Sequence, residues 1–255
     1  MLIDTHCHLY DEAFRDDFDA VLARAREAGL EACVMPGIDR STHAALVAMA
    51  DALPGFAFPC IGLHPTSVGE DWEQELAFVR EHVGDRRWYA IGEIGLDEYW
   101  SKDHVQQQMR VLAEQICLAA RCDLPVIIHL REATDDFLRV LSDVRGVPLR
   151  GVMHAWSGSY EMYRRLLGLA DFKFGIGGVV TFKNAGVAQA LVKMSLDDVV
   201  LETDCPWLTP APYRGKRNEP SYVRLVAEKT AQIKGLTPEA VAAVTSANAR
   251  RLFKL

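Results

Sequence analysis

Short apolar runs alternate with amphipathic helical segments along the whole chain, and this alternation restricts the fold more than any other feature. Most of the runs are apolar on both faces, as in strands covered by helices. Eight have the length of a strand: residues 1–8, 31–37, 56–64, 88–95, 125–131, 149–156, 172–178 and 199–204. This order predicts parallel βαβ units. Since 255 residues is the size of one (β/α)₈ barrel, we predict an α/β fold with a single TIM-barrel domain over residues 1–255.

Helix patterns between the runs support this prediction. The first helix is expected within residues 13–30, ending at Gly29, and the last begins with Thr237 as N-cap and Pro238 as first helical residue. The clearest helix lies between the fourth and fifth strands. Its apolar residues recur at helical spacing on one face: Val105, Met109, Leu112, Ile116 and Ala119.

Composition excludes several classes of protein. A net charge of -7 argues against an extended basic surface for duplex nucleic acid. No apolar run reaches the roughly 18 residues of a membrane span, and the N-terminus lacks the pattern of a signal peptide. The six cysteines contain no Cys-x-x-Cys pair, so no disulfide framework is expected. We therefore expect a cytoplasmic protein without membrane contact, and a monomer by default.

Histidines and carboxylates occupy the ends of the predicted strands, where the active site of a β/α barrel lies. The residues at these ends are His6, His8, His64, Glu93, His129, His154 and Asp204. Burying so many titratable groups without a cation would cost several kcal/mol. Four histidines and two carboxylates, with His64 left aside, exceed the ligands of one tetrahedral zinc, which favours two divalent ions.

Strand periodicity adds two further carboxylates to the cluster at the strand ends, and three histidines lie outside the predicted strands. Side chains two positions apart share a face, so Asp4 joins His6 and His8, and Glu202 joins Asp204. We expect Asp4 and Glu202 to orient the metal-binding histidines. The remaining histidines fall in helical or loop sequence and are expected at the surface: His43, His82 and His104.

Six motifs give the chain a resemblance to a known family. The segments IDTHCH, GLHP, IGEIGLD, VIIHLR, LETDCPWLTP and RNEPSYV resemble the TatD family of metal-dependent deoxyribonucleases, and the likeness extends over essentially the whole chain. It implies an amidohydrolase-like barrel and 3′-5′ exonuclease behaviour. It also implies a ligand set: His6, His8 and Asp204 on one metal, His129 and His154 on the other, and Glu93 bridging the two.

Two positions depart from the family pattern. Ala155-Trp156 follows His154 where the family usually has Cys-Phe, and Glu98 stands in GLDEYW where relatives often carry an aromatic or another residue. The departures leave the metal ligands intact. We expect them to affect the fit of the substrate.

The chemistry that such a centre favours is phosphodiester hydrolysis by a water activated between two divalent metals, Mg²⁺, Mn²⁺ or Zn²⁺. Asp204 and Glu93 are the predicted catalytic residues, with Asp204 accepting the proton of the water. The predicted substrate is DNA, as single strands or strand ends. The residues predicted to bind it are His64, Arg131, Trp156, Trp207 and Arg217. Further aromatic and cationic candidates are Tyr99, Trp100, Tyr213, Lys183, Arg214 and Lys216.

Two other functions remain open at this level. An amidohydrolase or lactonase could use the same centre to attack a carbonyl carbon, although many such barrels bridge their metals with a carbamylated lysine and no lysine lies at a strand end here. A binding protein stabilised by metals but without catalysis is the second. Structural zinc sites are usually rich in cysteine, which this constellation is not.

Overall fold

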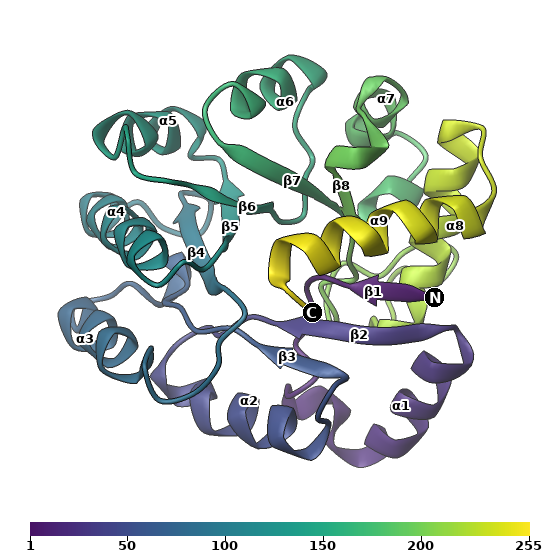
Figure 1. Cartoon of the computed structure of the whole chain (residues 1–255), viewed down its shortest axis with the longest axis horizontal. Coiled ribbons are helices and arrows are strands. Elements are labelled where there is room, and N and C mark those ends of the chain that lie inside the picture. Colours follow the sequence, from purple (N-terminus) through teal and green to yellow (C-terminus); the bar gives the residue numbers. More distant parts are fainter.

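Eight parallel strands surrounded by helices form the molecule in a computed structural model that describes residues 1–255 (Figure 1). The strands are β1 (Leu2–Asp4), β2 (Leu30–Met35), β3 (Ala57–Pro59), β4 (Ile91–Asp97), β5 (Val126–Arg131), β6 (Arg150–Met153), β7 (Asp171–Ile176) and β8 (Val199–Leu201). Neighbours in sequence are neighbours in space, in the orders β1-β2-β3 and β4-β5-β6-β7-β8. Every predicted strand is therefore present.

Backbone contacts beyond the strand ends join the two groups into a closed barrel. Ile61, just after β3, forms a parallel bridge with Ile91 of β4. On the other side, Cys7 and Cys205 form a parallel bridge after β1 and β8. The amide of Thr5 also donates to the carbonyl oxygen of Leu201 at 2.9 Å. The predicted (β/α)₈ barrel is confirmed, and its closure aligns the carboxyl ends of all eight strands.

Nine α-helices form the outer layer: α1 (Phe18–Glu27), α2 (Arg40–Ala52), α3 (Trp72–His82), α4 (Val105–Arg121), α5 (Thr134–Asp143), α6 (Tyr160–Leu167), α7 (Gly186–Lys193), α8 (Val223–Lys234) and α9 (Pro238–Phe253). The predicted apolar face of α4 is buried at Met109, Leu112 and Ile116. Helix α9 begins as predicted, since the Thr237 side chain accepts from the amide of Ala240. The first predicted helix instead starts with a 3₁₀ turn, Glu12–Asp17, before α1 begins.

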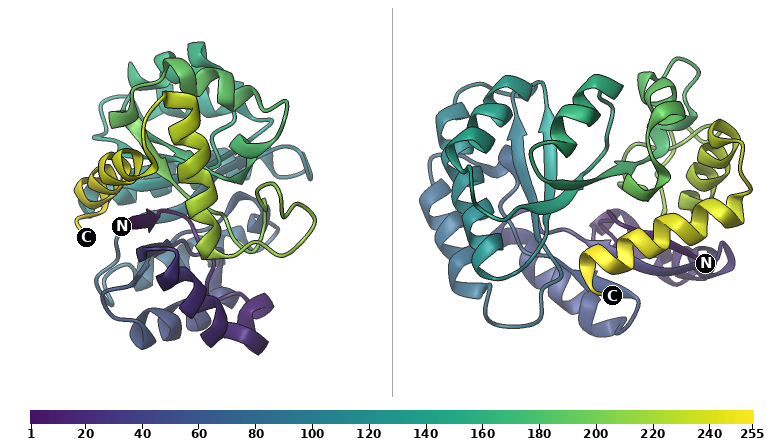
Figure 2. Two further views of the ribbon diagram at one scale, coloured as in Figure 1. Left: turned by 90° about the vertical axis from the view of Figure 1, so that its right-hand side faces the viewer. Right: turned by 45° about the horizontal axis from the view of Figure 1, so that its top comes forward.

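The last turn of α9 covers the end of the barrel at which the strands begin (Figures 1 and 2). Ala249, Leu252 and Phe253 pack in one buried cluster with the lower barrel interior. That interior is formed by Ile3, Ala32, Val34, Cys60, Ala90, Ile127, Val152 and Val200. Ser246 also donates to the carbonyl oxygen of Met1, at the start of β1. With this end filled by apolar side chains, only the opposite end is left for polar chemistry. No helix combines the length and the hydropathy that a membrane span requires.

Candidate metal centre

The six residues predicted as metal ligands come together at the carboxyl ends of the strands. They are contributed by five different parts of the barrel: His6 and His8 after β1, Glu93 within β4, His129 within β5, His154 after β6 and Asp204 after β8. Chain segments up to 198 residues apart therefore meet at one place, as the contacts between His6 and Asp204 show. The closed barrel is what brings these strand ends together.

One group of ligating atoms surrounds the Nε2 atoms of His6 and His8, which lie 3.1 Å apart. Glu93 Oε2 lies 3.1 Å from His6 Nε2 and 3.8 Å from His8 Nε2. Asp204 Oδ1 lies 3.6 Å from the first and 3.8 Å from the second. Four potential ligand atoms thus face a common centre.

A second group surrounds the other carboxylate oxygen of Glu93. Glu93 Oε1 lies 3.0 Å from His129 Nδ1, 3.3 Å from His154 Nε2 and 3.3 Å from His64 Nε2. The Glu93 side chain is almost fully buried between the two groups. A carboxylate whose two oxygens face separate sets of histidines has the arrangement expected of a bridging ligand.

Local backbone geometry holds these residues close together. The amide of Asp204 donates to the carbonyl oxygen of His6 at 2.9 Å, and Asp204 has a φ of 57°, which Asp tolerates better than most residues. Gly95, two residues after Glu93, has a φ of 152°. A Cβ at Gly95 would collide with the backbone of His129. Glycine is therefore required for the close approach of β4 to β5 at the centre.

The two carboxylates predicted to orient histidines differ in how they contact them. Glu202 Oε1 lies 3.2 Å from His154 Nδ1 and accepts from the amide of Ala155 at 2.5 Å. Asp4 contacts the backbone of His6 instead of its ring, accepting from that amide at 3.2 Å, and it also accepts from Thr203 Oγ1 at 2.5 Å. Burial raises the pKa of Asp4 to about 8. Asp4 thus links β1 to the segment that carries Asp204.

Asp97, the last residue of β4, is a functional candidate that the sequence analysis missed. Its Oδ2 lies 2.8 Å from His129 Nε2, the nitrogen on the far side of the ring from Glu93. Its Oδ1 accepts from the amides of Tyr99 and Trp100 at 3.0 and 3.3 Å. Strand periodicity could have found it, because positions 93, 95 and 97 share one face.

The buried carboxylates of the cluster favour positive charge on the groups around them. Burial opposes ionisation of His154, but the carboxylates of Glu93 and Glu202 outweigh it and raise the pKa of His154 to about 10. Burial also raises the pKa of Asp204 to about 6, against the attraction of His154 and His6. Buried carboxylates in this number are stabilised by cations, either protonated imidazoles or metal ions.

The donor set fits divalent metal ions. Two nitrogens on one tetrahedral zinc, at about 2.0–2.1 Å from it, are about 3.3 Å apart, close to the 3.1 Å between His6 Nε2 and His8 Nε2. The Nδ1 atom of His6 is buried without a hydrogen-bond partner. Imidazole nitrogens with carboxylate oxygens suit Zn²⁺ and Mn²⁺, and the oxygens also suit Mg²⁺.

Three of the predicted substrate-binding residues lie at the mouth of the barrel. His64 Nδ1 accepts from the amide of Thr66, so its Nε2 carries the proton and donates toward Glu93. Trp207 is 46% exposed and lies edge-on to His8, with ring centroids 5.0 Å apart. The guanidinium of Arg131 lies over the ring of Tyr99.

The structure does not support the other two. Trp156 is 6% exposed and packs edge-on against Phe174 of β7, so its ring belongs to the core and no base can stack on it. Arg217 forms a two-pronged ion pair with Asp17, at 2.8 and 2.7 Å, and also donates to the carbonyl oxygen of Ala13. Its guanidinium is directed to the 3₁₀ turn before α1 and is engaged there by Asp17 and Ala13, not at the metal centre.

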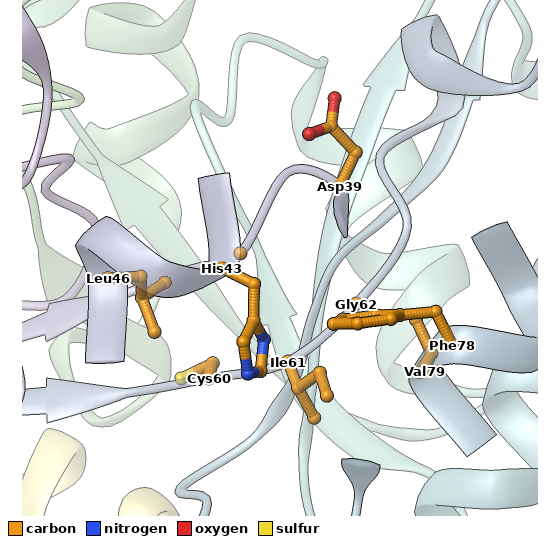
Figure 3. A pocket seen from close by; sticks show the side chains of 9 residues that line it. Asp39, His43, Leu46, Cys60, Ile61, Gly62, Phe78 and Val79 are labelled. Atoms are coloured by element: carbon orange, nitrogen blue, oxygen red, sulfur yellow. The ribbon is translucent and has the colours of Figure 1, made fainter. Parts of the chain in front are cut away.

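His43 and His82 also differ from their predicted surface positions. His43 is partly buried, and its ring packs edge-on against Phe78, which stacks on His82. Figure 3 shows His43 pointing from α2 toward the segment at Cys60 and Ile61, into a cavity of about 10 Å³. That volume holds one water at most, so this cavity is no substrate site.

Comparison with known proteins identifies close relatives. The family model described as TatD related DNase matches residues 3–254. YabD of Bacillus subtilis (strain 168), an uncharacterized metal-dependent hydrolase, is 41% identical over 256 residues, covering 100% of each chain. The 3′-5′ ssDNA/RNA exonuclease TatD of Erwinia billingiae (strain Eb661) is 31% identical, covering 100% of this chain and 99% of that protein. The crystal structure of the TatD homolog YjjV from Escherichia coli K12 has a TM-score of 0.92 at 29% identity, covering 100% of this chain and 98% of that one.

Proposed function

Because the chain belongs to the TatD family of metal-dependent hydrolases, we propose that it cleaves phosphodiester bonds of DNA from a strand end, with two divalent ions at the strand-end centre. The observation that carries the proposal is the position of Glu93, whose two carboxylate oxygens face two separate groups of histidines. We propose that residues 1–255 form one hydrolase domain that carries this centre.

Each residue of the centre has a distinct part in this proposal. His6, His8 and Asp204 would hold one ion, His129 and His154 the other, and Glu93 would contact both. The ions would supply Lewis acidity toward the phosphoryl oxygens and the attacking water.

Asp204 is the proposed base. Its side chain is the most exposed of the carboxylates at the centre, so it is the acid that an incoming water reaches most directly. His64 donates toward Glu93 from the rim of the barrel, and we assign it a contact with the substrate.

A strand end is the substrate form best matched to the charge of the chain. With a net charge of -7 the surface offers no basic groove for a long duplex, so attraction must be local to the centre. The relative from Erwinia billingiae is named a 3′-5′ ssDNA/RNA exonuclease, which supports the same polarity for this chain.

The test removes metal with a chelator, restores Mg²⁺, Mn²⁺ or Zn²⁺ one at a time, and follows single-stranded DNA labelled at the 5′ or the 3′ end. We expect stepwise shortening from the 3′ end only after a metal is restored, loss of activity in His129→Ala, and full activity in the control His43→Ala. Equal cleavage of closed circular and linear DNA, or activity insensitive to chelation, would refute the proposal.

A carbonyl-directed hydrolase is the alternative outcome of the same test. Esters, lactones and N-acyl amides assayed beside the oligonucleotides distinguish the two, because an amidohydrolase would turn over one of these and leave DNA intact. If His129→Ala left every hydrolysis unchanged, a binding protein with structural metals would be the remaining function.

A further inference from the structure

Two exposed aromatic rings on the loop after β4 and an arginine at the end of β5 form a cluster beside the centre. Trp100 is 70% exposed and Tyr99 48% exposed, and their rings meet edge-on at 5.0 Å. The guanidinium carbon of Arg131, at the end of β5, lies 3.6 Å from the centroid of the Tyr99 ring and 5.4 Å from that of Trp100. We call Tyr99, Trp100 and Arg131 the aromatic platform.

The platform is fixed to the centre by Asp97. One oxygen of this buried carboxylate accepts from the amides of Tyr99 and Trp100, and the other contacts His129. Gln108 of α4 holds the backbone of Asp97 on both sides, accepting from its amide at 2.9 Å and donating to its carbonyl oxygen at 3.2 Å. The exposed rings therefore sit on a rigid support.

Trp207 lies on the other side of the barrel mouth from the platform. It follows β8 and lies beside His8, which follows β1. In a closed barrel with strands in sequence order, the pair β8 and β1 lies opposite the pair β4 and β5. The centre thus lies between exposed aromatic residues on two opposite sides.

We infer that the aromatic platform stacks on a base of the single-stranded substrate while Trp207 contacts the strand on the opposite side. The inference rests on the proposed function and adds how the strand is recognised. Aromatic rings joined to an arginine are the chemistry of single-strand channels, because every base has a π-face and the guanidinium attracts the phosphates.

The test compares Trp100→Ala with Leu169→Ala, a control whose side chain is 54% exposed on the loop before β7. Binding of a fluorescent single-stranded dodecamer with a nuclease-resistant phosphorothioate backbone to the metal-loaded protein is measured by anisotropy, with intact bases or with one abasic position moved along the strand. We expect Trp100→Ala to raise the Kd about 5- to 150-fold, as loss of one stacked base does, and Leu169→Ala to leave it unchanged.

The abasic series identifies stacking specifically. The wild type should lose affinity when the abasic position reaches the platform, whereas Trp100→Ala should be insensitive to it. If the wild type degrades DNA with metal but Trp100→Ala binds and degrades it equally well, the inference is wrong and the proposed function stands. If the wild type neither binds nor cleaves DNA, both fail.

Discussion

Replacing Asp97 with asparagine tests whether the carboxylate behind His129 prepares this ring for metal binding. Asp97 Oδ2 lies 2.8 Å from His129 Nε2, which assigns the ring proton to Nε2 and leaves Nδ1, 3.0 Å from Glu93, free to bind a cation. An asparagine amide of the same shape would direct an NH₂ group either at His129 Nε2 or at the amides of Tyr99 and Trp100. In the first orientation the ring proton moves to Nδ1, and in the second two amides lose their acceptor.

The expected magnitude follows from losing an oriented carboxylate behind a ligand. Such changes weaken metal affinity about 10- to 100-fold, which corresponds to about 1.4 to 2.7 kcal/mol. The loss concerns one of two ions, since His129 and Asp97 contact only the group around Glu93 Oε1. We therefore expect one of two binding steps to weaken in Asp97→Asn.

The assay is competition for Mn²⁺ or Zn²⁺ between the protein and a chromogenic chelator, with circular dichroism as a check of folding. Asp103→Asn, an exposed aspartate on the same loop, is the matched control and should bind both ions as the wild type does. Two unchanged binding steps in a folded Asp97→Asn protein would refute the role assigned to Asp97.

Three further predictions follow from particular contacts. Glu93→Gln should fold, as judged by circular dichroism, but lower both metal retention and hydrolysis more than about 100-fold, because both groups share this carboxylate; retention of either would contradict the bridging geometry. Gly95→Ala should lower the free energy of unfolding in urea by about 3 kcal/mol or more, whereas Gly84→Ala, with open space around it, should change it little; equal midpoints would be inconsistent with the close approach of β4 and β5. Although burial opposes its ionisation, hydrogen bonds from Arg24 hold the pKa of Glu219 below its ordinary value, so its contribution to stability is present above about pH 4.3 and lost as the pH falls through the folded-state value. Urea titrations of Glu219→Gln should show a weaker dependence on acid than the wild type, and identical pH profiles would speak against this ion pair.

The fold and the centre were predictable from sequence because each depends on a pattern that can be recognised in the amino-acid sequence alone. Strand-length runs alternating with helices predict the barrel, and a barrel predicts where strand ends meet. His6 and His129 could thus be placed together although 123 positions separate them along the chain, and in the structure each lies within 3.1 Å of a Glu93 oxygen.

What sequence did not reveal depends on packing between distant segments. Trp156 is buried because Phe174 of the next strand lies against its ring, and nothing near Trp156 in sequence indicates this. Arg217 is paired with Asp17, 200 residues earlier, so one of the positive charges of this loop is neutralised by a segment that is distant in the sequence. Asp97 shares a face with Glu93 by strand periodicity, but its contact with His129 of the neighbouring strand is apparent only in the structure.

The most direct test of the account is the amount of divalent metal that the purified protein retains after exhaustive dialysis against metal-free buffer, measured by mass spectrometry of the elements. The shared position of Glu93 between two histidine groups predicts about two ions per chain in the wild type, and fewer than one in Glu93→Gln. Retention of no ion by the wild type, after loading with Mn²⁺ and with Zn²⁺, would contradict the central claim that this strand-end cluster is a metal centre.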